Sequence, residues 1–477
     1  MQNDMPEFLK EEAATTVIES LRIPLHSRLW QLVLSQKTNL KNLSVLIFVN
    51  FLIAGIGFIT QVKIANTLGR ETFGLLAYGL AIATYGGVFI RFGLDRTLVR
   101  DLIHYPEHFG ELVAASLLLR WLLLAFVVIA FSAWRLILGA GSDISWGLIL
   151  VIIANSMMSM DLQPVYDSWR QMSRHAVYNL IQRCLYFTTI WVIIVVAPTK
   201  LGIPLIGVST MGSVICYLTL QHRWAMSRLS LPASRGEIFI SAIKMARKNL
   251  TIWLAAVSTL SFASLNQLVL KHYRGTAELG GYAAVWLMVS LAMMLLNQVA
   301  RVGNPMMALV TRDDIQQKER NRFLLKYVCV MIFTVSPIAL AAICFPVMIM
   351  KTLFRPEYVS AASVLRIMGV YMYVYAVGLV ASQFVVSIRL EKTYFASIFT
   401  GGIISIVACF LLIPPMGANG AGVALLVSTS TAIGLCWFAI SRTTAKQEAI
   451  SEVSAKRSLE RCFFQYPLRK RELKVES

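Results

Sequence analysis

The sequence predicts an all-α polytopic membrane protein with about 12 transmembrane helices in two six-helix lobes related by a parallel repeat. The first observation behind this is composition. Of 477 residues, 57% are hydrophobic and only 14% are charged, whereas an ordinary soluble domain has about 25% charged residues. The second is a one-sided distribution of basic residues, and the third is a pair of recurring glycine motifs. Composition alone therefore excludes an ordinary soluble protein.

Twelve apolar segments match the length that a helix needs to cross a bilayer core, which is about 20 residues. They cover residues 43–62, 73–90, 112–131, 146–163, 177–197, 203–221, 250–270, 281–300, 327–347, 359–386, 395–413 and 419–440.

Basic residues indicate which side of the membrane each connecting segment faces. The chain has 44 Lys and Arg against 25 Asp and Glu, a net charge of +19. When the connecting segments are numbered alternately from the N-terminus, one set carries 34 of the basic residues and the other carries 8. Cytoplasmic segments are enriched in Lys and Arg, so both termini are predicted to be cytoplasmic. The charge thus indicates topology and does not point to nucleic acid.

This pattern divides the chain into a cytoplasmic N-terminal segment, an N-terminal lobe, a basic linker, a C-terminal lobe and a basic cytoplasmic tail. In order, they cover residues 1–42, 43–221, 222–249, 250–440 and 441–477. Apolar residues recur at helical spacing in 13–35, which predicts either a surface amphipathic helix or an irregular tail. The connecting segments on the outer side are too short for a catalytic domain.

A weak duplication relates the two lobes. Gly-x4-Gly motifs at 69–74 and 275–280 are offset by 206 residues, and Gln61 and Gln267 share this offset. Each predicted lobe has six spans, and because this number is even, both lobes enter the membrane from the same side. Chance recurrence of glycine in short turns is the alternative. A second pair of motifs lies at the starts of the sixth and twelfth spans, at residues 202–207 and 417–422.

Motifs of enzymes and cofactor sites are absent from the sequence. It has no P-loop, no His-Glu-x-x-His and no Gly-x-Ser-x-Gly element. Its seven cysteines are scattered without a Cys-x-x-Cys pair. We therefore expect no catalytic residues, no metal site and no cofactor.

Arg120 and Arg366 are the two arginines that the charge count assigns to the interior of predicted spans. Ionisable groups in the membrane are costly to bury and are functional candidates by default. One interpretation is a cationic lumen between the lobes, where arginine suits bidentate contact with phosphate. The alternatives are a salt bridge from Arg120 to Asp161 or another acid, and snorkelling of Arg366 to the membrane surface.

Further candidates lie near the cytoplasmic ends of spans. Arg96 and Arg100 share a helical face after the second span, where they would either contact an entering phosphate or anchor the helix to anionic headgroups. Asp161 is the candidate carboxylate for ion coupling, or a partner of arginine. Tyr371 and Tyr375 share a face in the tenth span, as sugar-stacking residues would, although core packing is the favoured explanation.

The motifs resemble a known family. Residues 64–78, followed by Phe92-Gly93-Leu94, are similar to the N-terminal signature of bacterial Wzx-type O-antigen and polysaccharide flippases. These flippases belong to the multidrug/oligosaccharidyl-lipid/polysaccharide exporter superfamily. The pattern Trp-Phe-x-Gly, usual before the fifth span, is replaced by residues 166–169, Tyr-Asp-Ser-Trp. Supporting pieces occur in order at residues 166–172, 278–282 and 415–422.

The resemblance implies a central lumen between two lobes and transport by alternating access. The implied substrate is an undecaprenyl-pyrophosphate-linked oligosaccharide, moved across the bacterial inner membrane during synthesis of O-antigen, capsule or exopolysaccharide. Implied partners are membrane lipids, a polysaccharide polymerase and chain-length proteins, and no nucleic acid.

Four other functions remain open from the sequence. A peptidoglycan-precursor flippase typically has fourteen spans, two more than the sequence predicts. A multidrug or cation antiporter of the same superfamily would need buried acids. A membrane-embedded glycan polymerase or ligase would need a large outer loop. A structural subunit of a synthesis complex would use the basic tail to bind partners or anionic lipid.

Overall fold

The computed structural model is helical throughout most of the residues it describes, and eleven of its helices are long and apolar enough to cross a membrane. The chain is therefore a multi-pass membrane protein, and the predicted fold class is confirmed. The predicted surface segment 13–35 lies outside the described residues. The structure describes residues 37–138, 144–169, 171–197, 201–229, 235–311, 317–388 and 390–464.

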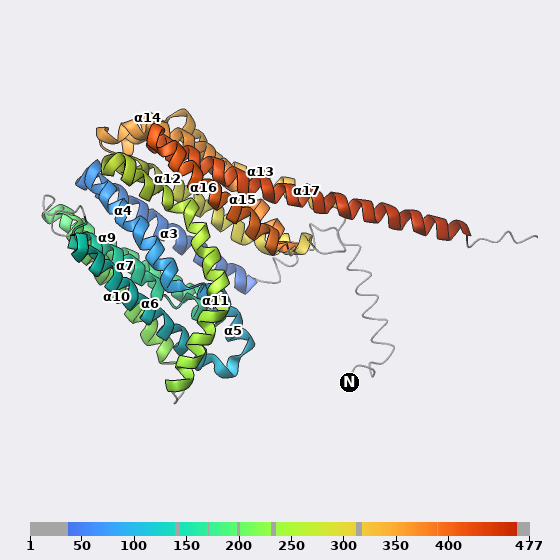
Figure 1. Ribbon diagram of the computed structural model, residues 1–477, viewed down its shortest axis with the longest axis horizontal. Coiled ribbons are helices and arrows are strands. Elements are labelled where there is room, and N and C mark those ends of the chain that lie inside the picture. The colour runs from blue at the N-terminus through green and yellow to red at the C-terminus, as the bar shows by residue number, and fades with distance from the viewer. Residues whose placement is uncertain are drawn as a thin grey trace, which may run out of the picture.

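The N-terminal lobe contains helices α3 to α10, drawn in blue and green in Figure 1. A left-handed turn at Phe92 and Gly93 (φ 46° and 72°) ends the long α4 and starts the short α5. The helices are α3 Lys37–Leu68, α4 Arg70–Arg91, α5 Leu94–His104, α6 Phe109–Leu138, α7 Trp146–Met157, α8 Gln163–Ser168, α9 Met172–Val196 and α10 Ile203–Met226, with 3-10 turns η1 Pro106–His108 and η2 Met158–Met160.

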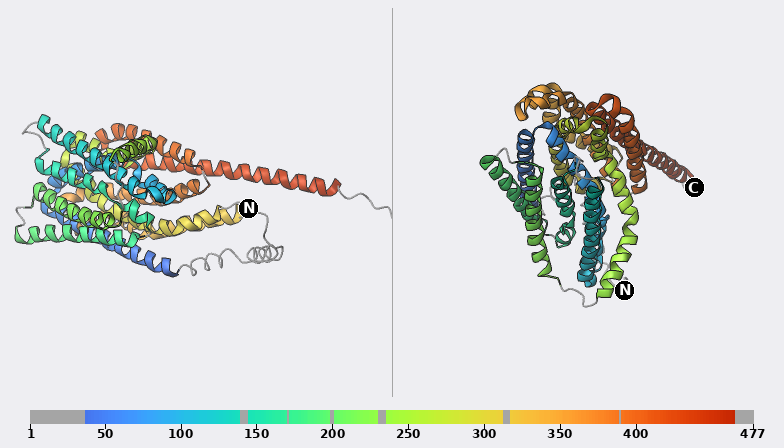
Figure 2. Two further views of the ribbon diagram at one scale, coloured as in Figure 1. Left: turned by 90° about the horizontal axis from the view of Figure 1, so that it is seen from below. Right: turned by 60° about the vertical axis from the view of Figure 1, so that its left-hand side comes forward.

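The C-terminal lobe lies beside the first and contains α12 to α17, drawn in yellow to red (Figure 1). The last helix continues far beyond its predicted end at residue 440 and extends out of the bundle (Figures 1 and 2). The elements are α11 Arg235–Ala263, α12 Leu265–Val310, α13 Gln317–Cys344, α14 Pro346–Leu353, η4 Pro356–Ala361, α15 Ala362–Ser387, α16 Glu391–Met416 and α17 Ala418–Phe464.

The seventh predicted span, 250–270, is divided between two helices. Helix α11 ends at Ala263, α12 begins at Leu265, and α12 is itself interrupted at Gly275 (φ 82°). The first part of α12 therefore completes the seventh predicted span, and the second part is the eighth. Because the first half of α11 is basic, α11 does not by itself qualify as an apolar span. The described residues therefore contain eleven candidate membrane-spanning helices, whereas the sequence predicted about twelve.

Helix α11 connects the lobes. Its first half, predicted as a linker, is helical and binds the N-terminal lobe: the Lys248 ammonium lies 2.8 Å from the Asp101 carboxylate, and the Thr97 hydroxyl donates to Asn249 Oδ1 at 2.7 Å. Its contacts include α6 on one lobe and α16 on the other. Figure 1 shows α11 crossing the bundle between the two groups of helices.

The two lobes meet most closely at the end of the bundle that the charge pattern predicts to be outside, which we call the outer end. Here α4 and the second part of α12 begin with the repeated glycine motifs. A Cβ on Gly74 would overlap the Thr276 carbonyl oxygen, and one on Gly280 would overlap the Arg70 carbonyl oxygen. Only glycine permits this contact between backbones.

Hydrogen bonds extend the same contact between lobes. The Arg70 guanidinium donates to the carbonyl oxygens of Ala277 (2.6 Å) and Glu357 (3.2 Å). The Asn66 side chain donates to Leu353 O at 2.8 Å and accepts from Arg355 N at 3.0 Å. We call this set, with Gly74 and Gly280, the outer clasp. It closes the outer end of the structure.

Candidate functional site

A cavity lies between the lobes beneath the outer clasp. This outer cavity has a volume of about 390 Å³ and is bordered by α3 and α4 on one side and by α12 on the other. Gln61 and Gln267, the pair related by the sequence offset of 206, both line it. The predicted repeat thus places matching amides on the two walls of one cavity.

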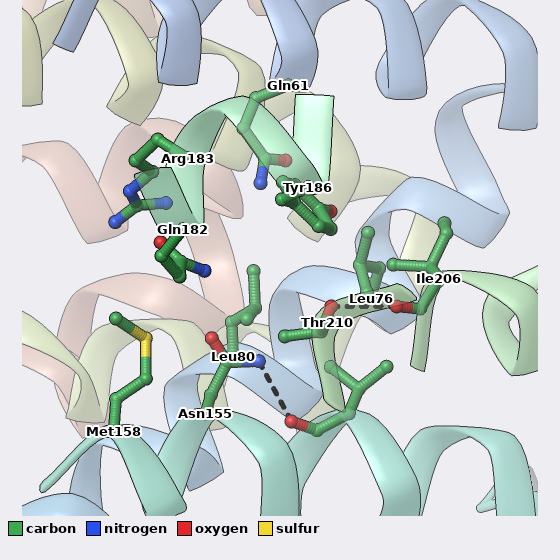
Figure 3. A pocket seen from close by; sticks show the side chains of 11 residues that line it. Gln61, Leu76, Leu80, Asn155, Met158, Gln182, Arg183, Tyr186, Ile206 and Thr210 are labelled. Atoms are coloured by element: carbon green, nitrogen blue, oxygen red, sulfur yellow. Dashed lines mark hydrogen bonds between the residues drawn. The ribbon is translucent and has the colours of Figure 1, made fainter. Parts of the chain in front are cut away.

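Arg183 lies where the N-terminal lobe opens toward this space. It lines an N-lobe cavity together with Gln61, Gln182 and Tyr186, and Figure 3 shows these side chains around one space. It also lines an inter-lobe cavity of about 270 Å³, whose other wall is α12 at Leu287–Met294. The guanidinium is therefore the cation that α9 presents between the lobes.

Arg183 has no hydrogen-bonding or charged partner in the part of the chain that the structure describes. Its Nε is buried without a hydrogen-bond partner, and no described residue forms a salt bridge or hydrogen bond with its guanidinium. An arginine held in this way at mid-membrane is costly, and a ligand anion would satisfy it.

The sequence analysis did not single out Arg183. The charge count assigned this arginine to the cytoplasmic segment before the fifth span, although it lies within the predicted span 177–197, and the structure places it near the middle of α9, Met172–Val196. The signal was therefore present in the sequence, because an arginine inside a predicted span is a functional candidate. Arg301, also counted as a loop residue, lies in α12 and lines a cavity.

Side-chain oxygens without partners accompany Arg183. The amide oxygens of Gln61, Gln182 and Gln298 are buried and accept no hydrogen bond from the described residues. Each of these glutamines lines one of the cavities. Amide oxygens are hydrogen-bond acceptors, so each of the three could accept a hydrogen bond from a hydroxyl group of a ligand.

Two cavities lie on the C-lobe side. The amide cavity, about 660 Å³, is bordered by α12 and α15 and contains Asn297, Gln298, Arg301 and Gln383. The aromatic cavity, about 340 Å³, is enclosed by α12, α15, α16 and α17 and includes Trp286. None of the described residues that line these five cavities is acidic. Cationic ligands would find no counter-charge there.

Arg120, a predicted substrate contact, lies in a buried network inside the N-terminal lobe. Its side chain is 2% exposed and forms a salt bridge with Asp95 at 3.0 Å. Its other terminal nitrogen donates to the carbonyl oxygens of Ser159 (3.2 Å) and Asp161 (2.6 Å). The geometry therefore corresponds to the salt-bridge alternative, with Asp95 as the acid and the Asp161 backbone as a second partner. Arg120 does not line the cavities described above.

Asp161, the predicted coupling carboxylate, lies at the other side of this network. Its Oδ1 accepts a hydrogen bond from Gln163 N at 2.8 Å and lies 2.8 Å from His175 Nε2. The same ring nitrogen is 3.0 Å from the Tyr217 hydroxyl. The carboxylate thus joins the start of α8 to α9 and α10, and it too lies outside the five cavities.

The remaining predicted contacts lie on the surface. Arg366 is exposed near the start of α15. It precedes Tyr375 by nine residues, which places the two side chains on opposite faces of the helix, so Arg366 points away from the cavity that Tyr375 lines. Arg100 is exposed on α5 and contacts Asp101 at 3.2 Å. The structure brings neither Arg366 nor Arg100 to Arg183, and the side chain of Arg96 is outside the described residues.

A family model for polysaccharide biosynthesis proteins matches residues 39–310. The chain belongs to the polysaccharide biosynthesis protein family. No curated protein sequence matches it. The family and the fold described above confirm the resemblance to Wzx-type flippases that the motifs indicated, and both are typical of transporters and flippases rather than of enzymes.

Solved structures share the fold of this polysaccharide biosynthesis protein. The lipid II flippase MurJ, in an inward closed conformation, aligns with a TM-score of 0.65 and 14% identity over 83% of this chain and 87% of that one. The MATE multidrug transporter DinF-BH aligns with 0.60 and 15% over 86% and 96%. An inward-facing MATE transporter of the MOP superfamily aligns with 0.53 and 12% over 85% and 95%.

Proposed function

We propose that this protein is a flippase that moves a lipid-linked oligosaccharide across the bacterial inner membrane by alternating access. The carrying observation is Arg183, a cation without a partner among the described residues, between two lobes that are closed at one end. A pyrophosphate would neutralise it and can accept bidentate hydrogen bonds from a guanidinium. Family membership supports a substrate of polysaccharide synthesis, and one protein of this fold is a lipid II flippase.

The proposal includes the undecaprenyl-pyrophosphate anchor, the cytoplasmic termini and delivery of repeat units to a polymerase and chain-length proteins. The charge pattern supports the sidedness, since the closed outer clasp lies at the end poor in Lys and Arg. Arg100 and Arg96, on the cytoplasmic α5, stay proposed entry contacts. Arg183 takes the phosphate-binding role first assigned to Arg120 and Arg366.

A multidrug or cation antiporter is the second candidate, supported by the MATE structures of similar fold. Cationic substrates require an acidic group near the binding site, and the described residues of the cavity linings include none. The charge of the cavities therefore favours an anionic substrate.

Replacement of Arg183 by glutamine tests the proposed function. We expect Arg183→Gln to reduce export of the surface polysaccharide at least tenfold, because it removes the only cation among the described residues that line the inter-lobe cavity. The measurements are the amount of polysaccharide at the cell surface, which should fall, and the amount of lipid-linked oligosaccharide in the cytoplasmic leaflet, which should rise. The matched control is Arg322→Gln, at an exposed arginine of α13. Normal export by Arg183→Gln at normal protein levels would contradict the proposal.

We also propose that Asp161 carries the coupling proton, shared with His175 and close to Tyr217. Arg120 contacts only its backbone oxygen, so the carboxylate is not committed to that cation. We expect export by Asp161→Asn to lose its dependence on a proton gradient in vesicles, whereas Asp167→Asn on the same segment keeps it. Unchanged gradient dependence in Asp161→Asn would show that the coupling ion binds elsewhere.

A further inference from the structure

The aromatic cavity has no Lys or Arg among its described lining residues, so the binding of phosphate does not account for it. Four helices of the C-terminal lobe contribute Trp286, Tyr371, Tyr375, Tyr394 and Cys436 to its wall. Its volume of about 340 Å³ falls in the range of about 300–1,000 Å³ typical of small-molecule sites. The rings therefore border a space that a ligand group can enter.

Polar groups lie among the rings. The Tyr371 and Tyr375 ring centroids are 6.2 Å apart with planes at 39°, so the rings are neighbours on one face of α15. Asn297 Nδ2 donates to the Tyr375 hydroxyl at 3.3 Å, and the hydroxyls of Ser382 and Thr429 belong to the lining. The wall thus combines aromatic faces with hydroxyl groups, whereas an ordinary apolar core has few polar groups.

The aromatic cavity adjoins the site of Arg183 through shared walls. Trp286, Met293 and Leu379 line both the aromatic and the amide cavities. Ser290 and Met294 line both the amide and the inter-lobe cavities, and Arg183 lines the latter. A ligand longer than one sugar can therefore contact the cation with one end and the rings with the other.

We propose that the aromatic cavity binds a sugar ring of the substrate while Arg183 binds its pyrophosphate, an inference that rests on the proposed function. The C–H groups on one face of a pyranose are attracted to the electron-rich face of an aromatic ring. Its hydroxyls can pair with Ser382 and Thr429, and those in the adjoining cavity with the free Gln298 oxygen. A prenyl chain has no hydroxyl groups, so it would form none of these hydrogen bonds and would leave the Gln298 oxygen without a donor among the described residues.

Cys436 permits a chemical test of the cavity, because this residue belongs to the lining and is otherwise buried, so a reagent reaches it only by entering the cavity. The full-length protein is treated with N-ethylmaleimide, and modification is quantified for each cysteine by peptide mass spectrometry. The two probes are farnesyl pyrophosphate and the same molecule carrying a disaccharide. Binding of each probe to the protein and to Arg183→Gln is measured in parallel. Cys329 and Cys344, exposed on α13, are internal controls.

We expect both probes to bind in an Arg183-dependent way and only the disaccharide-bearing probe to slow modification of Cys436, at least fivefold. Protection by farnesyl pyrophosphate alone would overturn the inference, because the cavity would then take the lipid chain. Binding of both probes without protection would also overturn it and leave the proposed function standing. If neither probe bound, the proposed function would fail and the inference with it.

A pair of variants at Tyr375 separates ring stacking from general damage to the fold. Tyr375→Leu removes the ring, and we expect it to abolish most of the fivefold protection by the disaccharide-bearing probe without changing the affinity for farnesyl pyrophosphate. Tyr375→Phe keeps the ring and should retain most of the protection. Equal loss for both probes in Tyr375→Leu, or equal protection in the leucine and phenylalanine variants, would contradict a role of the ring.

Discussion

Arg120 and Arg183 are both arginines within apolar helices, and their surroundings give them different roles. Arg120 is fully buried and paired with Asp95 and backbone oxygens, whereas Arg183 borders the inter-lobe cavity and has no pairing among the described residues. From the sequence, Arg120 could be recognised as intramembrane because leucines flank it on both sides. Its partner could not, since Asp95 reaches it only through the turn at Phe92 and Gly93.

The salt bridge of Arg120 leads to a prediction about stability. Removal of the Arg120 guanidinium takes away its contacts with Asp95 and with the carbonyl oxygens of Ser159 and Asp161, and a buried acceptor left unsatisfied costs about 1–3 kcal/mol. We therefore expect Arg120→Met to lower the thermal unfolding midpoint in detergent markedly, and Arg120→Met with Asp95→Asn to lower it by less than the sum of the single changes. Arg322→Met, at an exposed site, serves as the control.

Arg120→Met also separates the structural role from the substrate contact that the sequence suggested. A variant that unfolds at the normal temperature but has lost export would contradict the structural role and favour direct contact with the substrate.

At the scale of elements, the repeated glycine motifs explain how α4 and α12 meet. Gly69 and Gly275 adopt similar left-handed conformations (φ 78° and 82°), and the glycines five residues later permit the contact between backbones. The sequence predicted the repeat but could not predict that its two copies touch each other. The second motif pair differs more, since Gly202 is extended and Gly417 has a φ of 57°.

The contact at Gly280 predicts how the outer clasp responds to one added methyl group. Gly280→Ala would bring Cβ against the Arg70 carbonyl oxygen, and overpacking of this kind costs about 1–3 kcal/mol in the closed state. We expect the open state to become about tenfold more populated. The readout is modification of Thr84→Cys, in the outer cavity, by a membrane-impermeant maleimide added outside.

Gly434→Ala is the matched control for the clasp, because its Cβ would meet nothing within 4 Å. Faster labelling in Gly280→Ala alone would support the clasp as the outer closure. Equal rates in the parent, Gly280→Ala and Gly434→Ala would show that the contact does not limit access from outside.

At the scale of the whole molecule, hydropathy and charge were sufficient to predict the membrane-spanning helices, and the repeated glycine motifs predicted their division into two lobes. They could not place the lumen, because apolar residues facing lipid and apolar residues facing a cavity look alike in a sequence. The lumen depends on the packing of segments more than 200 residues apart: Gln61 and Gln267 line the same cavity, and Asn66 accepts a hydrogen bond from Arg355 N. Polar groups spread thinly over α3, α9 and α12 become one site only after these helices pack.

In the proposed mechanism, alternating access requires the outer clasp to open during each cycle, after the cavities beneath it have bound substrate from the cytoplasmic side. Asn66 lies against the backbone of residues 353–355, so Asn66→Cys with Arg355→Cys places two thiols across the lobes. We expect oxidation of this pair to stop export in vesicles and a reductant to restore it, while farnesyl pyrophosphate still binds at Arg183. Oxidation of either single variant should leave export at its own starting level. Continued export by the cross-linked protein would mean that the substrate leaves by a route that does not pass between α4 and α12, and the two-lobe mechanism would have to be abandoned.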